Sequence, residues 1–260
     1  MVIALLGAAV AILSLQASEL RRLPTRDADQ GVASRRHDLY AVSNHVIARI
    51  DAASGREATR WQGDPALFPH INSCTADRAT LVCAASNFPA VPMDSRIERF
   101  DARTLRHLST QPLGHGYGSL TWAMRHGGAW WACFANYDKH GGELGRDHRF
   151  TTLVRYDRDW REQARFRFPD DILDLMAPKS ASGGAWGRDG LLYVTGHDRP
   201  ELYVLRVPAE SGVLVHVATV ALPTDGQAIA WDAKDPRLLW SVERSTRELV
   251  ASHIPVIDAR

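Results

Sequence analysis

The sequence has almost no net charge, because 31 Lys and Arg residues balance 30 Asp and Glu residues and leave a formal charge of +1. The basic residues are also scattered, whereas binding to nucleic acid or an anionic membrane needs a basic patch or stripe. Low-complexity segments are missing too, and eight Trp residues are spread along the chain, which argues against disorder. We therefore expect a folded globular protein with no nucleic-acid partner.

The signatures of several common enzyme chemistries are missing as well. The sequence contains no Gly-x-Ser-x-Gly nucleophile elbow, no His-Glu-x-x-His, no P-loop and no dinucleotide-binding glycine fingerprint. It also lacks a Cys-x-x-Cys pair and any Cys/His spacing typical of zinc sites. No reaction class can be assigned from a motif, so function has to be sought in the fold and in the placement of polar residues.

Cysteine is scarce, with three residues in 260: Cys74, Cys83 and Cys133. Cys74 and Cys83 flank the turn-like segment 76–79, so they can face each other across a hairpin. A disulfide between them is permitted if the protein is exported. The alternative is three reduced cysteines in the core, and the sequence does not decide between the two.

Long apolar runs are absent except at the N-terminus, where residues 2–15 (VIALLGAAVAILSL) carry no charge. This run is too short to span a bilayer comfortably. It is typical of the hydrophobic region of a secretory signal peptide, with cleavage near Ala17. We therefore predict a signal peptide at 1–17, a periplasmic or secreted protein, and no stable membrane insertion after cleavage. Because no basic residue follows Met1, a retained N-terminal anchor is the alternative.

A five-residue block recurs along the chain. The clearest copies are 118–122 (GSLTW), 182–186 (SGGAW) and 227–231 (QAIAW), and weaker copies lie at 30–34 (QGVAS) and 70–74 (HINSC). The fourth position is always small, as expected where several innermost strands crowd around one axis. The copies begin 40, 48, 64 and 45 residues apart, close to the blade period of about 40–50 residues in β-propellers.

Each block is followed by further strand-like segments. Nearly continuous apolar runs, typical of strands buried on both faces, occupy 39–44, 81–87, 130–136, 191–197 and 238–244. Alternating, half-exposed strands follow at 46–51, 96–101, 152–157, 201–206 and 248–253. Fourth, outer strands are predicted at 56–62, 106–111, 161–168 and 213–221.

The fifth copy ends at Pro255 with no room for a fourth strand, and the N-terminus offers a replacement. Segment 19–25 carries Leu-Pro-Thr shortly before Gln30, just as segment 217–224 does before Gln227. The sequence therefore predicts an all-β, five-bladed β-propeller with four antiparallel strands per blade, whose last blade is closed by the N-terminal strand. We expect a single domain over 18–260 that is a monomer; an all-β sandwich is the alternative.

Segment 192–196 (LYVTG) resembles the core of the YVTN-type propeller repeat. Over residues 19–257 the pattern is similar to the broad family of exported bacterial propellers with such repeats. Plant-type glutaminyl cyclases and olfactomedin domains share the five-bladed shape, although no motif here connects the chain to either. The resemblance implies the fold and leaves the function open, since this architecture carries enzymes, binding proteins and scaffolds.

Propeller geometry places two sets of loops on one face: those entering the innermost strand and those joining the second and third strands. Both sets are polar here. The entries begin at Gln30, His70, Gly118, Ser182 and Gln227, with Asn72 just inside. The exits of the second strands are Asn44, Asn87, Asn136, His197 and Arg244. Because Asn also tolerates positive φ and caps turns, a purely local role is the alternative for Asn44 and Asn87.

The densest chemical cluster runs from His197 and Asp198 to Glu201. A carboxylate beside an imidazole can orient it for acid–base work, although Asp198 can also simply stabilise the turn before Pro200. Glu243 and Arg244 form either an ion pair or a site in which Arg244 holds an anionic substrate, and we expect the ion pair.

Two long connections lie on the same face, at 88–95 and 137–151, and long loops in compact domains are often functional. The second contains Asp138, His140, Glu143, Asp147 and His148, which are enough groups to bind a divalent cation such as calcium or zinc. Their spacing matches no standard metal loop, so a solvated flap is the alternative.

Three functions fit these observations. The leading hypothesis is an exported propeller that binds a polar small molecule or peptide in a pocket lined by Gln30, Asn72, Asn87, Asn136, His148, Ser182, Glu201, Gln227, Glu243 and Arg244. The second is a hydrolase, lyase or cyclising isomerase on the same face, with or without a metal, in which His197, Asp198 and His70 are the catalytic candidates. The third is a protein–protein scaffold with an apolar rim. Whether the protein is an enzyme stays open.

Overall fold

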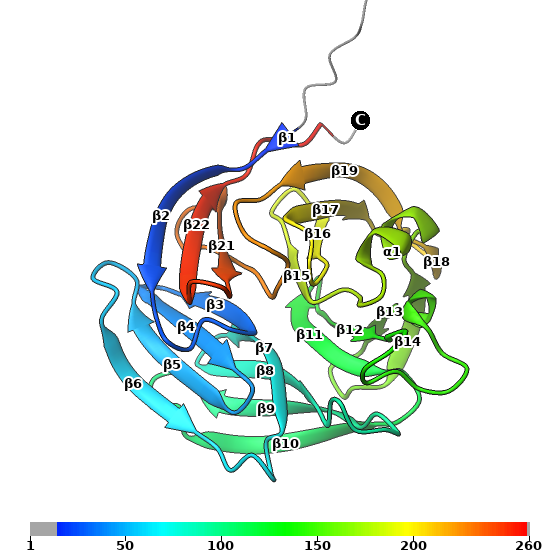
Figure 1. Ribbon diagram of the computed structural model, residues 1–260, viewed down its shortest axis with the longest axis horizontal. Helices are drawn as coiled ribbons and strands as arrows, with labels where there is room; N and C mark the ends of the chain where they lie inside the picture. Colours follow the sequence, from blue (N-terminus) through cyan, green and yellow to red (C-terminus); the bar gives the residue numbers. More distant parts are fainter. Residues whose placement is uncertain (1–14, 259–260) are drawn as a thin grey trace, which may run out of the picture.

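Five β-sheets surround a central axis like the blades of a propeller (Figure 1). The computed structural model describes residues 15–258. Every blade contains four antiparallel strands, and blades 3 and 4 each gain a short parallel strand at the outer edge. The predicted all-β, five-bladed propeller is confirmed.

The strands follow the order predicted from the repeats. Blade 1 contains β3 (Gly31–Arg35), β4 (Asp38–Ser43), β5 (Val46–Asp51) and β6 (Glu57–Gln62). Blade 2 contains β7 (His70–Asp77), β8 (Thr80–Ser86), β9 (Ser95–Asp101) and β10 (His107–Gly114). Blade 3 contains β11 (Ser119–His126), β12 (Ala129–Ala135), β13 (Thr152–Tyr156), β14 (Glu162–Arg167) and the added β18 (Gly212–Val213). Blade 4 contains β15 (Gly183–Trp186), β16 (Leu192–Thr195), β17 (Glu201–Arg206), β19 (Val215–Ala221) and the added β1 (Leu15–Gln16). Blade 5 contains β20 (Ala230–Trp231), β21 (Leu238–Glu243), β22 (Glu248–His253) and β2 (Ser18–Pro24).

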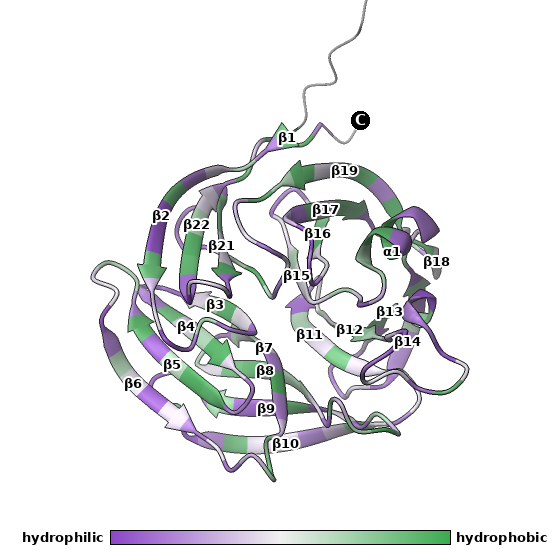
Figure 2. Ribbon diagram, viewed as in Figure 1, coloured by the Kyte–Doolittle hydropathy of each residue, from purple (hydrophilic) through white to green (hydrophobic). Residues whose placement is uncertain are grey.

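The hydrophobic core is divided among the interfaces between neighbouring blades. Five clusters of buried apolar side chains occur, and each joins two adjacent blades. Tyr40 of blade 1 and Phe100 of blade 2, for example, are fully buried in one cluster. The outer strands β2 and β6 are largely hydrophilic (Figure 2), and nearly all of their residues are exposed or half-buried. Burial between blades is thus what holds the ring together.

The N-terminal strand closes the ring, as predicted. Strand β2 pairs antiparallel with β22, so that Leu23 lies opposite Leu249. Arg22 Nη1 also donates to Glu248 Oε2 at 3.0 Å. The preceding strand β1 pairs in parallel with β19 of blade 4, so the N-terminal segment joins blades 4 and 5. The predicted signal peptide falls mostly on residues 1–14, which lie outside the described residues. No helix within 15–258 is long and apolar enough to cross a membrane.

Two features were not predicted. The 64-residue step between the third and fourth blocks contains a short helix, α1 (Asp170–Met176), and a 3₁₀ turn, η1 (His148–Phe150). Ile172, Leu173 and Met176 of α1 pack into the core between blades 3 and 4. The strand register also corrects the repeat alignment by one residue in blade 3. Ser119, not Gly118, lies opposite the last residue of the second strand there, as His70 does in blade 2.

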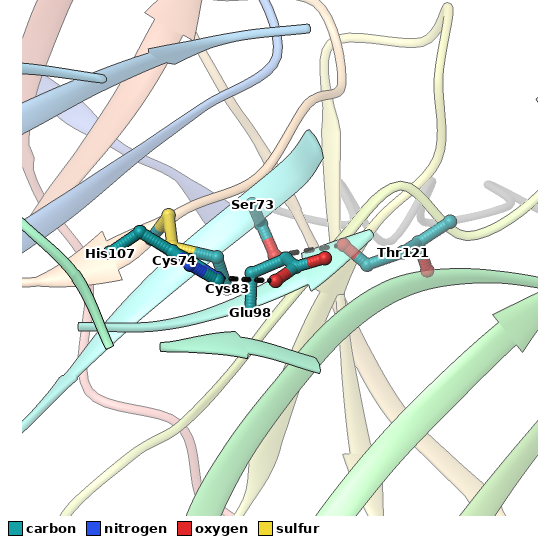
Figure 3. Close-up of a disulfide and its surroundings, with 6 residues drawn as sticks. All are labelled: Ser73, Cys74, Cys83, Glu98, His107 and Thr121. Carbon is teal, nitrogen blue, oxygen red and sulfur yellow. Dashed lines mark hydrogen bonds and ion pairs between the residues drawn. A yellow bond between two sulfur atoms is a disulfide. The ribbon is translucent and has the colours of Figure 1, made fainter. Parts of the chain in front are cut away.

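The open question about the cysteines is resolved by the structure. Cys74 of β7 and Cys83 of β8 lie directly opposite each other and form a disulfide (Figure 3). Next to it, Ser73 Oγ donates to the Thr121 carbonyl of blade 3 at 2.8 Å. Cys133 is free and buried, and burial raises the pKa of its thiol to about 12, so it stays protonated at neutral pH.

Candidate functional site

A cavity of about 410 Å³ opens at one end of the central channel; we refer to this end as the mouth. Six of its lining residues come from the innermost segments of the blades: Gln30, His70, Asn72, Thr121, Ser182 and Gln227. Six more come from the connections after the second strands: Phe88, Tyr137, Lys139, His140, His197 and Arg244. Pro178 and Lys179, from the segment after α1, complete the wall. The two loop sets expected to share one face do meet here.

Two lining side chains are directed by irregularities in the inner strands. The register of β7 shifts between Ile71 and Ser73, and the register of β11 shifts between Leu120 and Trp122. Asn72 and Thr121 are the extra residues at these bulges, and both line the cavity. Bulges commonly redirect a side chain next to a functional site.

Hydrogen bonds between blades hold the mouth together. Asn72 Nδ2 donates to the Leu120 carbonyl at 2.7 Å, which joins blades 2 and 3. Thr195 Oγ1 donates to the Gln227 carbonyl at 2.7 Å, which joins blades 4 and 5. The Ala228 amide donates to the Gln30 carbonyl at 3.2 Å and so joins blades 5 and 1. The cavity therefore has a preformed floor.

Of the residues predicted for the site, seven line the cavity: Gln30, His70, Asn72, Ser182, His197, Gln227 and Arg244. Asp198 does not line it but contacts His197. Asn87, Asn136, His148, Glu201 and Glu243 lie outside its lining, and their side chains make local contacts.

Two of these five residues are asparagines whose side chains stabilise loops. For Asn87 this is the purely local role expected as the alternative from the sequence. Asn87 Nδ2 donates to the Pro92 carbonyl at 3.0 Å, and its Oδ1 accepts from the Asp94 amide at 2.7 Å. Asn136 is 4% exposed and donates to the carbonyls of Tyr117 and Phe150. Both amides are thus occupied by backbone groups.

The other three are also engaged. His148 is buried and its Nδ1 lies 2.6 Å from Asp138 Oδ1. Glu201 accepts a hydrogen bond from the Tyr203 hydroxyl at 2.6 Å, and Glu243 accepts one from Ser245 Oγ at 2.6 Å.

The expected ion pair between Glu243 and Arg244 is wrong. Arg244 instead lies near Asp29, with 3.5 Å between its Nε and Asp29 Oδ1.

His197 is surrounded by charged groups. Its Nε2 lies 3.1 Å from Arg244 Nη1, and its Nδ1 lies 2.6 Å from Asp198 Oδ1. Lys179 Nζ lies 2.9 Å from the same Nδ1 and donates to Asp198 at 3.0 Å. Burial and the positive charges of Lys179 and Arg244 lower the pKa of His197, although Asp198 acts in the opposite direction. His197 is therefore a neutral ring whose lone pair is already engaged.

His70 is held on the other side of the mouth. Its Nδ1 lies 2.7 Å from Asn44 Oδ1 and donates to that oxygen, which leaves Nε2 as the unprotonated nitrogen. Burial lowers the pKa of His70 to about 4. The ring is thus neutral at physiological pH, and it is a weaker base than an ordinary histidine.

An aromatic wall faces His70. The ring of Phe88 lies 5.1 Å from that of His70, 5.2 Å from that of Tyr137 and 5.4 Å from that of His140, measured between centroids. The backbone of Gly141 approaches Phe88 so closely that a Cβ there would lie 2.3 Å from the ring. The two long loops therefore pack against each other and form this side of the cavity together.

The lining is rich in cations. It contains Lys139, Lys179 and Arg244 as well as three histidines, and it contains no Asp or Glu. Two carboxylates outside the lining pair with these cations: Asp198 pairs with Lys179, and Asp29 pairs with Arg244 as well as with Arg247. The mouth thus presents hydrogen-bond donors to whatever occupies it.

The structure offers little support for the metal site considered in loop 137–151. Glu143 Oε1 accepts from the Met93 amide at 2.6 Å, Asp147 caps η1, and Asp138 pairs with His148. Over residues 15–258 no group of three or more His, Cys, Asp or Glu side chains is placed to hold a metal ion. Asp138 and Asp147 thus stabilise this loop itself, and Glu143 joins it to loop 88–95.

Sequence reasoning did single out the loops 88–95 and 137–151, and named His140 as a candidate metal ligand. As lining residues it missed His140, Phe88, Thr121, Tyr137, Lys139, Pro178 and Lys179. The best available signal was the unusual length of the step that contains α1. Apolar residues at Ile172, Leu173 and Met176 have helical spacing, and a helix there would have brought the segment after it over the mouth.

No family model and no curated protein sequence matches this chain. Among solved structures, the PQQ-bound form of an aldose sugar dehydrogenase from Streptomyces coelicolor is similar in fold, with a TM-score of 0.57, 14% identity, and coverage of 94% of this chain and 82% of that one. Streptogramin B lyase gives 0.51 at 11% identity, covering 92% and 88%. A luciferin-regenerating enzyme gives 0.50 at 11% identity, covering 96% of both chains. At such low identity these likenesses show the fold alone.

Proposed function

We propose that this protein is an exported propeller that binds a polar small molecule in the cavity at the mouth. The observation that carries the proposal is the cavity itself: about 410 Å³, preformed, with an aromatic wall and several converging polar side chains. Small-molecule sites in proteins are typically concave and have a volume of roughly 300–1,000 Å³. This size favours a small molecule over an extended peptide.

The state of the two histidines favours binding over catalysis. A general base works best when its pKa is near the working pH, whereas the pKa of His70 is about 4. Each ring nitrogen of His197 lies beside a cationic donor, Nε2 at 3.1 Å from Arg244 and Nδ1 at 2.9 Å from Lys179, so its lone pair is engaged and not available to take a proton. The hollow, donor-rich mouth also differs from the shallow apolar top that a scaffold would present.

A screen of polar small molecules by thermal shift tests the proposal. Ser182→Trp should fill the mouth and abolish the stabilisation that a hit gives to the wild type. Ala53→Trp, on an exposed turn outside the cavity, is the matched control and should leave that stabilisation unchanged. Hits that stabilise both variants equally, or no hits from a broad screen, would contradict binding at the mouth.

Export is the second part of the proposal. It is supported by the uncharged apolar run at residues 2–15 and by the Cys74–Cys83 disulfide, since disulfides persist in oxidising compartments. Cleavage after Ala17 would remove β1 and leave β2 intact to close blade 5. Intact mass measurement of protein from the periplasmic and secreted fractions should find a chain beginning at Ser18. Full-length chain found in the cytoplasm only would argue against export.

A further inference from the structure

The mouth carries an excess of donors that the protein itself does not satisfy. Lys139 is exposed at the edge of the cavity, and within residues 15–258 its ammonium group forms no hydrogen bond or ion pair. Gln227 is 3% exposed and its Nε2 has no hydrogen-bond partner among those same residues. A buried donor without a partner is costly, so Gln227 points to a hydrogen-bond acceptor in the cavity, and Lys139 adds a cation at the edge that has no partner within the described part of the chain.

Arg244 has unused capacity as well. A guanidinium group has five N–H donors, and two contacts of Arg244 are described: Nη1 to His197 Nε2 at 3.1 Å and Nε to Asp29 Oδ1 at 3.5 Å. The first partner is a neutral ring, and the second also pairs with Arg247 at 3.0 Å. An anion would be a better acceptor, because charge-assisted hydrogen bonds are about twice as strong as neutral ones.

Part of the lining is apolar. Phe88, Tyr137 and Pro178 line the cavity, and the Phe88 ring is fixed between His70, Tyr137 and His140. A simple inorganic ion would leave these surfaces uncovered. A ligand that contacts both the donors and the apolar residues has an anionic group and an aromatic or aliphatic body.

We propose that the cavity binds a small organic anion, with its carboxylate or phosphate held by Arg244, Lys139 and Lys179 and its apolar body packed against Phe88. This proposal rests on the proposed binding function and adds the class of ligand to it. The cavity selects against cationic ligands because no carboxylate among the described residues lines it. A cationic ligand would meet the like charges of Lys139, Lys179 and Arg244 there.

The test uses a matched series on one scaffold: 3-phenylpropionate, 3-phenylpropionamide and 3-phenylpropylamine, with phenyl phosphate as the phosphate arm. Binding to the full-length mature protein is measured by ligand-observed NMR titration, and competition places the compounds at one site. The acids should bind at least about tenfold more tightly than the amide, and the amine should not bind. Comparison of phenyl phosphate with 3-phenylpropionate then shows which anionic group the site prefers.

Variants connect the preference to named residues. Arg244→Gln should weaken binding of the acids about 10- to 100-fold, the effect of removing a hydrogen bond to a charged group, and Lys139→Gln about three- to tenfold. Binding of the neutral amide should hardly change in either variant. Arg247→Gln is the matched control, because Arg247 pairs with the same Asp29 but does not line the cavity; it should change affinity less than twofold.

Three results would overturn the inference. If the amide or the amine binds at the mouth more tightly than the acids, the cavity binds ligands but not anions, and the proposed function stands without this addition. If Arg244→Gln and Arg247→Gln weaken binding of the acids equally, the preference for anions does not come from the cavity. If no compound of any charge binds, the inference and the proposed function both fail.

Discussion

The two ends of the central channel are built from the same five innermost segments and differ sharply in chemistry. The mouth has a cavity of about 410 Å³ lined by cations, histidines and amides. The opposite end, which we refer to as the base, has a cavity of about 210 Å³ lined by small residues and by Trp122, Trp186 and Trp231. Within each inner segment the early residues face the mouth and the later residues face the base.

The origin of the side chains explains the difference. At the mouth, most lining groups come from bulges and loops, where a change of residue costs little packing. At the base they come from strand residues packed between blades. The ring of Trp122 lies on Gly184 of blade 4, where a Cβ would come within 2.3 Å of it. We therefore expect changes at the base to alter stability and changes at the mouth to alter binding.

The largest effect is expected from Trp122→Ala. Trp122 is 2% exposed, and truncation of a buried Trp typically lowers the free energy of unfolding by about 3–5 kcal/mol. Urea unfolding measures the loss, and Trp122→Phe should recover part of it. Affinity for a mouth ligand should be unchanged, since Trp122 does not line that cavity. An unaltered unfolding midpoint would contradict the assignment of the base to stability.

His70, at the mouth, should also affect stability, and its effect should depend on pH. Burial lowers the pKa of His70 from 6.5 to about 4, so between these values the unfolded chain takes up a proton that the folded protein does not. The free energy of unfolding should therefore fall as the pH drops from about 6.5 to 4, by at most about 3 kcal/mol. Nothing further should be lost through this residue below pH 4.

Comparison with His70→Gln isolates this contribution from that of other titrating groups. The variant should lose less stability than the wild type between pH 7 and pH 4, as measured by urea unfolding at each pH. His253→Gln, on an exposed histidine away from the mouth, is the control and should follow the wild type. Parallel curves for all three proteins would mean that His70 is not buried as neutral imidazole.

The Cys74–Cys83 disulfide should have the next largest effect on stability. Cys74 lines the base cavity, and the disulfide joins residues nine positions apart. Constraint of a loop of that length in the unfolded chain is worth about 2–3 kcal/mol in the chain-entropy model. Unfolding of a Cys74→Ala, Cys83→Ala double variant measures the loss, and its ligand affinity should equal that of the wild type. A change in ligand affinity without a change in stability would contradict the expectation that residues at the base affect stability and not binding.

The smallest effect is expected from Ser182→Ala at the mouth. The Ser182 hydroxyl lies 3.5 Å from the Ser180 carbonyl, at the limit of hydrogen bonding. Its removal should change the free energy of unfolding by less than about 0.5 kcal/mol, as measured by urea unfolding. A loss as large as that of Trp122→Ala would show that the two ends are equally important for folding.

The same comparison shows what could be predicted from the sequence. The blades, their order and the closing strand followed from periodicity, because repeated packing constraints leave a repeated pattern. The mouth positions of Gln30, His70 and Gln227 followed from the same repeat. The one-residue correction at Ser119 shows the limit of that reasoning, since register depends on pairing partners and not on residue similarity.

The rest of the site depends on parts of the chain that do not repeat. Lys179 reaches the mouth only because α1 carries the chain back over it. Asn87 and Asn136 look equivalent to other exits in the sequence, but their amides are used by nearby carbonyls. Which polar residue faces the cavity is thus decided by local hydrogen bonding that no periodic pattern records.

The most direct test of the central claim is a map of backbone amide chemical-shift changes in the ¹⁵N-labelled mature protein on addition of 3-phenylpropionate. The account predicts changes concentrated at the mouth, around His70, Phe88, Lys139, His197 and Arg244, with none around Trp122 and Trp231 at the base. Changes concentrated at the base, or spread over the outer strands with the mouth unaffected, would contradict it.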